Sequence, residues 1–141
     1  MTTLAIFSNK GGVGKTAAAV NLSYLAARTG ARTLICDLDP QGSATYYFRV
    51  KPKLKSGPKG FVKGAKGVYK SVKGTDFDNL DILPADFSLR KLDVLYSRFG
   101  NSKKQLKLML YPFACEYRLI ILDCPVTIGI LAENILTAAD V

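Results

Sequence analysis

Short apolar runs alternate along the chain with longer segments whose apolar residues recur at helical spacing. Each run is apolar at consecutive positions rather than at every second one, which is typical of parallel strands covered on both faces. This order predicts an α/β fold, with a parallel sheet and helices on both of its faces. The expected strands cover residues 4–7, 33–36, 80–84 and 118–122.

Local signals mark the ends of several expected helices. Gly30 follows an alanine-rich helical segment and is expected to end it. Ser88 and Ser102 are expected to begin two further helices, because a serine side chain can accept from the free N–H groups of a first turn. The expected helices cover residues 17–27, 88–96, 102–114 and 130–138, with a weaker basic helix at 61–72.

The size and composition of the chain fit one compact domain. It has 141 residues, of which 48% are hydrophobic and 22% charged, ordinary values for a globular protein. The sequence stops after the last expected helix, where a doubly wound sheet normally continues. We therefore expect residues 1–141 to be the N-terminal part of a single domain, incomplete at its C-terminal side, with one sheet edge uncovered. No apolar run is long enough to span a membrane, which favours a cytoplasmic protein.

The histidine and cysteine content narrows the chemistry. The chain has no histidine, which excludes histidine metal sites and Ser–His or Cys–His catalytic pairs. We interpret its three cysteines as free thiols, since Cys36 and Cys124 end apolar runs and an odd number cannot all pair. Catalysis would have to use carboxylates, lysines, backbone amides or a bound cation.

The positive charge is concentrated in one segment. Lys and Arg outnumber Asp and Glu by 20 to 11, and residues 51–73 supply eight of the nine excess charges without a single acid. Residues 51–74 are also rich in glycine, which predicts a basic insertion or loop. The segment is either a solvated, flexible insertion or a surface for DNA or another acidic partner. Its lysines are Lys51, Lys53, Lys55, Lys59, Lys63, Lys66, Lys70 and Lys73.

A glycine-rich segment lies between the first expected strand and the first helix. Its glycines let successive backbone N–H groups face one anion, and the helix N-terminus adds positive charge. Lys15 would reach the β- and γ-phosphates of a nucleotide, and Thr16 would offer its hydroxyl to Mg²⁺. Asn9 replaces the first glycine of the usual phosphate-loop motif, while a dinucleotide fingerprint fails at Ala17. The predicted nucleotide-binding residues are Gly11, Gly12, Val13, Gly14, Lys15, Thr16 and Ala17.

Acidic residues follow two of the expected strands. Asp123 ends one strand and is placed to hold the shell of a magnesium ion, together with Thr16. Asp39 follows the other strand and is placed to orient an attacking water, with Asp37 beside it as a further metal candidate. The alternatives are a helix cap at Asp123 and a polar turn at Asp37 and Asp39.

The order of these motifs resembles the ParA/MinD family of deviant Walker A ATPases, whose ParA branch acts in chromosome and plasmid partitioning. The resemblance implies a P-loop NTPase-like fold and the use of ATP and Mg²⁺. It also implies a homodimer on ATP, in which Lys10 reaches the partner's nucleotide as a catalytic residue beside Asp39. Expected partners are non-specific DNA, which would place the protein on the nucleoid, and a ParB-like or other activator. The resembling motifs cover residues 10–16, 37–42, 79–85 and 119–125.

Two positions depart from the family's pattern, namely Val126, where a second proline is usual, and Ala17, where a threonine is common. A membrane helix like that of MinD has no counterpart in the sequence, and an iron–sulfur relative is disfavoured because no cysteine follows Cys124. Two functions remain. One is a dimerising Mg-ATPase for DNA partitioning or cargo positioning, and the other is a nucleotide- or nucleic-acid-binding module without turnover.

Overall fold

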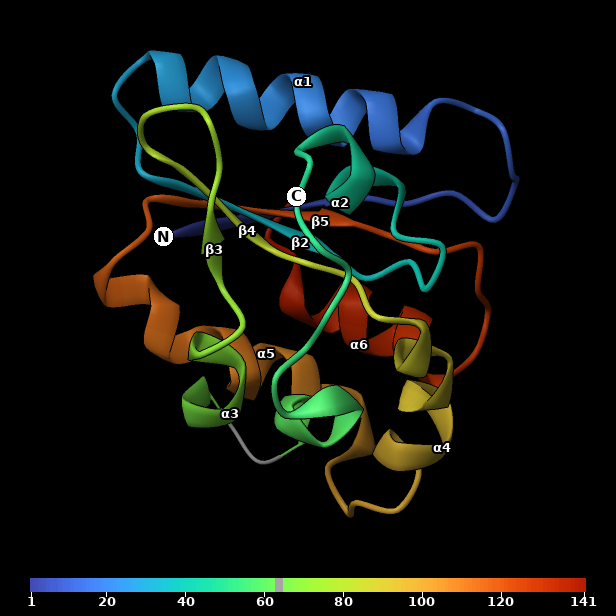
Figure 1. Ribbon diagram of the computed structural model, residues 1–141. Coiled ribbons are helices and arrows are strands. Elements are labelled where there is room, and N and C mark those ends of the chain that lie inside the picture. Colours follow the sequence, from blue (N-terminus) through green and yellow to red (C-terminus); the bar gives the residue numbers. More distant parts are fainter. Residues whose placement is uncertain (63–64) are drawn as a thin grey trace.

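Five strands form one sheet in the computed structural model, which describes residues 1–62 and 65–141. The strand order is β1-β5-β2-β4-β3, with β3 antiparallel to β4 at one edge and the other strands parallel (Figure 1). The register places Ile6 and Asp37 opposite Asp123, so β1, β2 and β5 end at the same edge. The strands are β1 (Thr2–Ile6), β2 (Thr33–Asp37), β3 (Lys73–Gly74), β4 (Leu80–Leu83) and β5 (Leu119–Asp123).

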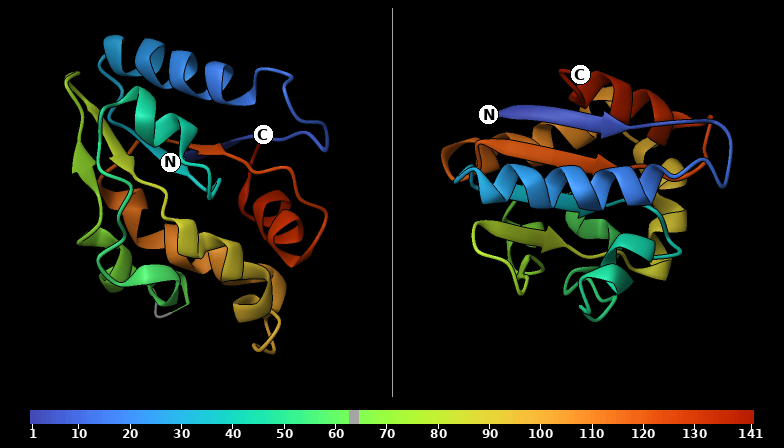
Figure 2. Two further views of the ribbon diagram at one scale, coloured as in Figure 1. Left: turned by 45° about the vertical axis from the view of Figure 1, so that its right-hand side comes forward. Right: turned by 90° about the horizontal axis from the view of Figure 1, so that it is seen from above.

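Helices cover both faces of this sheet, which confirms the predicted fold class. Figures 1 and 2 show helices packed against each face. The first face carries α1 (Lys15–Arg28) and α2 (Ser43–Tyr47), and the second carries α3 (Ala65–Tyr69), α4 (Leu92–Tyr96), α5 (Gln105–Leu110) and α6 (Ile130–Ala138).

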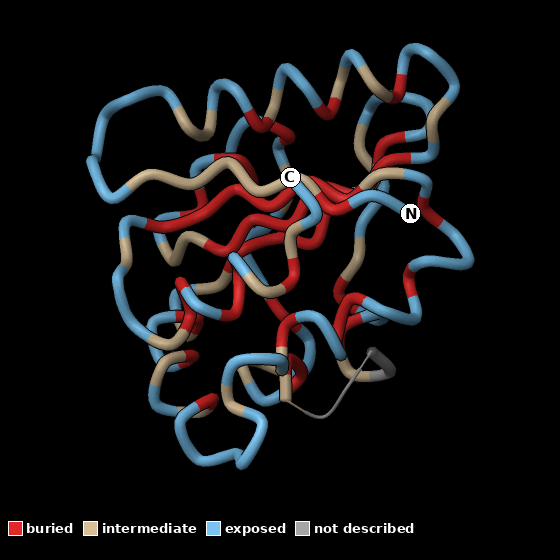
Figure 3. Tube along the Cα trace, turned by 180° about the vertical axis from the view of Figure 1, so that it is seen from behind, coloured by how far each residue is buried: buried red, intermediate tan, exposed pale blue. Residues whose placement is uncertain are grey.

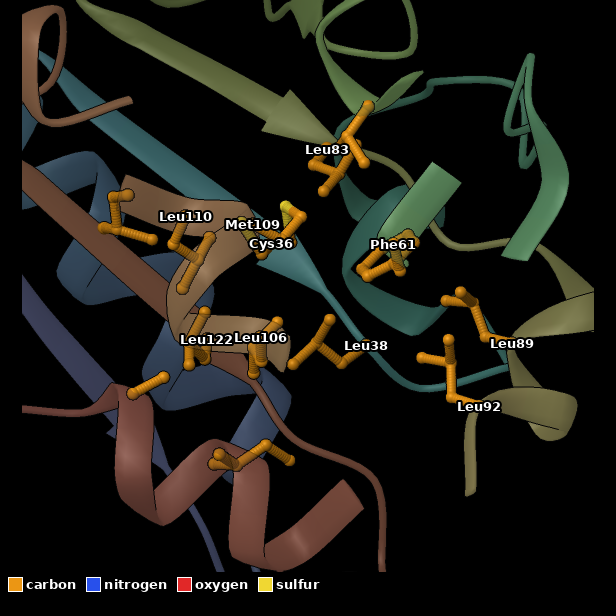
Figure 4. Close-up of a cluster of buried hydrophobic side chains, with 14 of the residues drawn as sticks. Cys36, Leu38, Phe61, Leu83, Leu89, Leu92, Leu106, Met109, Leu110 and Leu122 are labelled. Atoms are coloured by element: carbon orange, nitrogen blue, oxygen red, sulfur yellow. The ribbon is translucent and has the colours of Figure 1, made fainter. Parts of the chain in front are cut away.

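The two faces of the sheet bury separate clusters of apolar side chains. In β2, Leu34 and Cys36 belong to the cluster beneath α3 to α6, whereas Ile35 packs with residues of α1 and α2. Figure 4 shows part of the larger cluster, in which Cys36 and Leu122 of the sheet lie near side chains of α5. The inner strands are therefore buried along their length (Figure 3), which explains why they lack an alternating pattern.

The expected helix at 88–96 is interrupted and begins differently. It consists of a 3-10 turn (Phe87–Lys91) followed by α4. Its cap is Asp86, whose carboxylate accepts from the Ser88 N–H at 2.9 Å, so the prediction that Ser88 caps this helix is wrong. The Asp86 carboxylate also accepts a hydrogen bond from the Ser88 hydroxyl. Asp86 is therefore the acceptor at the start of this helix, and the Ser88 side chain is a donor.

The expected helices at 102–114 and 61–72 are also shorter. The first consists of α5 between two 3-10 turns (Ser102–Lys104 and Tyr111–Cys115), and it is preceded by Asn101 with no side-chain cap, so Ser102 does not cap it. Pro112 cannot donate a backbone hydrogen bond, which accounts for the tighter turn at this end. In the second region, a 3-10 turn (Gly57–Phe61) precedes the short α3.

Two short elements, α2 and β3, have no counterpart among the expected elements; they have five and two residues. The last two residues lie beside β1, where the Asp140 N–H donates to the Thr3 carbonyl at 2.8 Å and the Ala5 N–H donates to the Val141 carbonyl at 2.9 Å. None of the described helices is long and apolar enough to cross a membrane.

Candidate phosphate-binding site

The loop between β1 and α1 has a shape that depends on glycine. Gly12 and Gly14 have φ values of 70° and 87°, in the left-handed region that residues with side chains rarely adopt. Gly14 directly precedes α1, so the free N–H groups of the first helical turn lie at the end of this loop. The structure therefore contains the strand, loop and helix that a phosphate-binding segment requires.

A hollow of about 390 Å³ lies over this loop. All seven residues predicted to bind the nucleotide, from Gly11 to Ala17, line this hollow. Asp39 and Val126, which lie on two other loops, also line it. Ser43 and Tyr47 of α2 also line it. Sequence reasoning missed these two residues because it predicted no helix after the acidic loop.

The two lysines of the loop have different positions. The Lys15 ammonium donates a hydrogen bond to the carbonyl oxygen of Lys10 at 3.2 Å, which holds it within the loop. The side chain of Lys10 is exposed, as a residue that reaches toward another molecule must be. Its expected contact with a second subunit stays a prediction.

Asp123 is a buried carboxylate without a hydrogen-bond partner. Its side chain ends β5 and is fully buried, and neither of its oxygens has a partner within the described residues. Burial raises the pKa of Asp123, while Thr16 and Lys15 oppose that rise. Unpaired buried carboxylate oxygens are costly, so they mark a place where a cation or donor is expected.

Asp37 lies opposite Asp123 in the neighbouring strand and has a different environment. One of its oxygens accepts from the Thr45 backbone N–H at 2.8 Å and from the Thr45 hydroxyl at 2.7 Å, and the other accepts from the Asp39 N–H at 3.2 Å. Burial raises the pKa of Asp37 to about 6, against the effect of these bonds. The arrangement favours a role in holding the loop and α2, and its metal role stays a prediction.

Asp39 lies on the loop that faces the glycine-rich segment. It is half-buried and lines the hollow, and its carboxylate accepts from the Gln41 N–H at 2.9 Å. The polar turn considered as an alternative is therefore present, but it leaves Asp39 beside the phosphate loop. This placement is compatible with its predicted role in orienting water.

The oxygen donors near the phosphate loop, Thr16 of the hollow and Asp123 close to it, fit a magnesium ion rather than a metal site built from protein ligands alone. Within the described residues, no three Asp, Glu, His or Cys side chains form a ligand cluster. Magnesium usually takes one or two protein ligands and completes its shell with phosphate oxygens and water. Asp123, with both oxygens free of hydrogen bonds, and the hydroxyl of Thr16 match that requirement.

The lysine-rich segment forms a separate basic surface near β3. A hollow of about 430 Å³ is lined by Val50, Gly74 and four exposed lysines, with no acid among them. The backbone beneath is held in place, since the Leu54 N–H donates to Asp86 at 3.2 Å and the Lys55 N–H to the Ser71 hydroxyl at 2.9 Å. Lys63 lies outside the described residues, as does the side chain of Lys66. The four lysines are Lys51, Lys53, Lys55 and Lys73.

Known proteins resemble the chain along its whole length. The family model AAA_31, described as an AAA domain, matches residues 1–141. The sporulation initiation inhibitor protein Soj of Bacillus subtilis (strain 168) is 36% identical over 138 residues, which cover 97% of this chain and 54% of Soj. The chromosome partitioning protein ParA of Myxococcus xanthus (strain DK1622) is 35% identical over 138 residues, which cover 97% of this chain and 49% of that protein. The chain spans about half the length of these curated relatives.

Solved structures share the fold. Cobyrinic acid a,c-diamide synthase from Mycobacterium smegmatis, with bound ADP and magnesium, matches with a TM-score of 0.90 and 30% identity, over 99% of this chain and 57% of that one. A Cyanothece McdA variant in complex with ATP matches with a TM-score of 0.89 and 25% identity, over 99% of this chain and 54% of that one. Since the family model covers every residue and the similar sequences include partition proteins, the chain belongs to the AAA_31 family and, within it, to the ParA-like P-loop proteins.

Proposed function

We propose that this chain is the nucleotide-binding part of a Mg²⁺-dependent ATPase of the ParA type, which acts in DNA partitioning or cargo positioning. The observation that carries the proposal is Asp123, a fully buried carboxylate at the end of β5 with no hydrogen-bond partner among the described residues, close enough to Thr16 and Lys15 for both to affect its pKa. A structural helix cap would use its oxygens, whereas a magnesium site requires them free. The ADP and magnesium bound to a similar structure support the same nucleotide chemistry.

The residues of the hollow have distinct roles in this proposal. Lys15 and the backbone N–H groups of the glycine-rich loop would bind the phosphates, and Thr16 and Asp123 would hold Mg²⁺. The bound cation would neutralise charge on the transferring phosphoryl group. Asp39 would orient the attacking water, and Lys10 would add positive charge from the opposite subunit of a dimer.

Nucleotide binding is tested by Lys15→Ala. Isothermal calorimetry with Mg-ATP and Mg-ADP should show binding to the parent and none to this variant, because the phosphates lose their main cation. Lys107→Ala is the matched control, since Lys107 is an exposed lysine of α5 on the other face of the sheet. Equal affinity of the parent and Lys15→Ala would contradict the proposed site.

Turnover and dimerisation are tested by a second pair of variants. With ATP, Asp39→Ala should bind nucleotide and accumulate as a dimer, because hydrolysis stops after assembly. Lys10→Ala should bind nucleotide and stay monomeric. Sedimentation with ATP measures both, and a monomeric Asp39→Ala with a dimeric Lys10→Ala would reverse the roles. A parent that binds ATP but never hydrolyses it would favour a binding module instead.

The basic hollow favours DNA as the partner of this ATPase. Four lysines line it without an acid, and the buried Leu54 anchors the segment that carries three of them. Contacts to phosphates release counterions, so four such contacts predict a slope of log K against log salt of about −3.6. Binding should then weaken on the order of a hundredfold between about 50 and 200 mM salt.

A charge-reversal set tests this surface. Changing Lys51, Lys53, Lys55 and Lys73 to Glu should abolish retention of duplex DNA in a mobility-shift assay and leave ATP affinity unchanged. A matched set with the same charge change uses Lys91, Lys103, Lys104 and Lys107, which lie outside the hollow. If both sets weaken DNA binding equally, only net charge matters, and the hollow is not the DNA site.

A further inference from the structure

The hydrogen-bond acceptor that caps the start of helix α6 belongs to another helix, α4. The residue that precedes α6 is Gly129, which has no side chain, and the Leu131 N–H donates instead to the carboxylate of Asp93 in α4 at 2.6 Å. The first N–H groups of a helix lack partners within it, and the same end is electropositive. A carboxylate at this point satisfies a donor and offsets the positive charge, so Asp93 connects α4 to the start of α6.

The Asp93 carboxylate approaches Gly129 so closely that no side chain fits at position 129. A Cβ atom at position 129 would lie 2.6 Å from one carboxylate oxygen of Asp93 and 2.8 Å from the other, closer than real Cβ contacts. The φ of Gly129 is −86°, which residues with side chains adopt without strain. Glycine is therefore required here by the approach of Asp93 and not by the backbone conformation.

The segment held by this contact reaches the phosphate loop. Residues 125–129 connect the metal candidate Asp123 to α6, and Val126 lines the phosphate hollow together with Gly11. A Cβ atom on Gly11 would contact the Val126 side chain at 4.0 Å. Val126 also lines a neighbouring hollow of about 460 Å³, which contains both Asp39 and Asp93. Residues 125–129 are thus held by β5 at one end and by the contact with Asp93 at the other.

We propose that Asp93 is a positioning residue for ATP turnover, which fixes residues 125–129 against the phosphate loop. The inference rests on the proposed ATPase function, but its structural part does not need nucleotide. Asp93 touches no phosphate in this proposal and acts through the segment that carries Val126. Its loss should therefore change the rate of turnover more than the affinity for ATP.

The contact itself is tested by a double-mutant cycle in urea. Gly129→Ala should lower the unfolding midpoint in the parent, because the new methyl group meets the Asp93 carboxylate. In an Asp93→Ala background the same change should have little effect, since the space is then open. An equal loss in both backgrounds would overturn the contact, because sites that do not interact give additive effects.

Turnover is tested with Asp93→Ala, Asp93→Asn and Val94→Ala. Asp93→Ala should lower kcat about tenfold, equivalent to about 1.4 kcal/mol, with KM for ATP changed less than about threefold. Asp93→Asn keeps an acceptor oxygen and should recover most of the rate. Val94→Ala changes an exposed neighbour on the same helix and should match the parent.

The outcomes separate the two proposals. A parent that turns over ATP and an Asp93→Ala variant with the same kcat would overturn the positioning role alone. The same conclusion follows if Asp93→Asn is as slow as Asp93→Ala, because a lost negative charge would then explain the effect. A parent that neither binds nor hydrolyses ATP would overturn the proposed function, while the urea cycle still decides whether Asp93 and Gly129 interact.

Discussion

The ends of β2 and β5 lie side by side and carry an aspartate at the same level, yet the two carboxylates have opposite surroundings. Asp37 accepts three hydrogen bonds, from the backbone and hydroxyl of Thr45 and from the Asp39 N–H. Asp123, its register partner, accepts none from the described residues. Both side chains are fully buried, so burial alone does not distinguish them.

The difference separates a carboxylate that serves the fold from one that we propose serves a ligand. The hydrogen bonds to Asp37 offset part of its desolvation, and removing its side chain would leave the Thr45 donors without partners. An unpaired buried carboxylate costs free energy in the unliganded protein, so removing the charge of Asp123 relieves that cost. Substitutions at the two positions should therefore change stability in opposite directions.

The largest effect is expected at Asp37. Asp37→Ala should lower the free energy of unfolding of the nucleotide-free protein by about 3 kcal/mol, because it leaves two buried donors of Thr45 unsatisfied. Urea unfolding followed by circular dichroism measures the change. A loss below about 0.5 kcal/mol, as is usual for surface substitutions, would contradict the structural role of this carboxylate.

Asp123→Asn should weaken Mg-ATP binding about a hundredfold, which corresponds to about 2.7 kcal/mol. The same change should raise the free energy of unfolding without nucleotide by about 1 kcal/mol, because a buried unpaired charge is removed. Calorimetry and urea unfolding on one preparation give both values. Reduced stability with unchanged Mg-ATP affinity would mean that Asp123 belongs to the fold, as Asp37 does.

Thr45 connects the Asp37 carboxylate to the segment that follows β4, the strand beside β2. Its hydroxyl donates to Asp37 and accepts from the Ala85 N–H at 2.8 Å, just after β4. Thr45→Val keeps the shape but removes both bonds, and should lower the free energy of unfolding by about 2 kcal/mol. Thr45→Ser retains the hydroxyl, so its free energy of unfolding should fall clearly less than that of Thr45→Val. If valine and serine are equivalent in urea unfolding, the hydroxyl contributes nothing.

Asp86, which follows β4, gives the smallest effect and one that depends on pH. Burial acts against its charged form, but hydrogen bonds from Ser88 and Leu54, together with the charge of Lys53, outweigh burial and lower its pKa. Its contribution is therefore complete above its unfolded pKa of about 3.9 and is lost as the pH falls through the lower folded value. Asp86→Asn should lower the free energy of unfolding by about 1 kcal/mol at neutral pH. Urea titrations at pH 7 and pH 3 should show a smaller difference in acid.

The parts of the site that follow strands could be predicted from the sequence. Apolar runs such as the one ending at Asp123 define buried parallel strands, and parallel strands bring their following loops to one edge. The sequence therefore predicts that the glycine-rich loop, Asp39 and Asp123 lie near one another, and the first two line the hollow.

The contacts made by side chains over long distances could not be predicted in this way. Nothing local in the sequence shows that Thr45 holds Asp37, because α2 has only five residues and no apolar period. The same holds for Asp93 and Leu131, which are separated by 38 positions. The cap at residues 86–88 is a local case: Asp86 and Ser88 are both favoured caps by residue type, and the structure shows that Asp86 accepts the hydrogen bond.

If Lys15 binds phosphate as proposed, its ammonium must exchange one partner for another, because in this structure it donates to the Lys10 carbonyl. A phosphate that draws the Lys15 ammonium toward itself takes that donor away from Lys10. The backbone that carries Lys10 then loses a restraint at the same moment. In the proposed dimer, this single bond would couple nucleotide binding in one subunit to the freedom of the lysine expected to reach the second subunit.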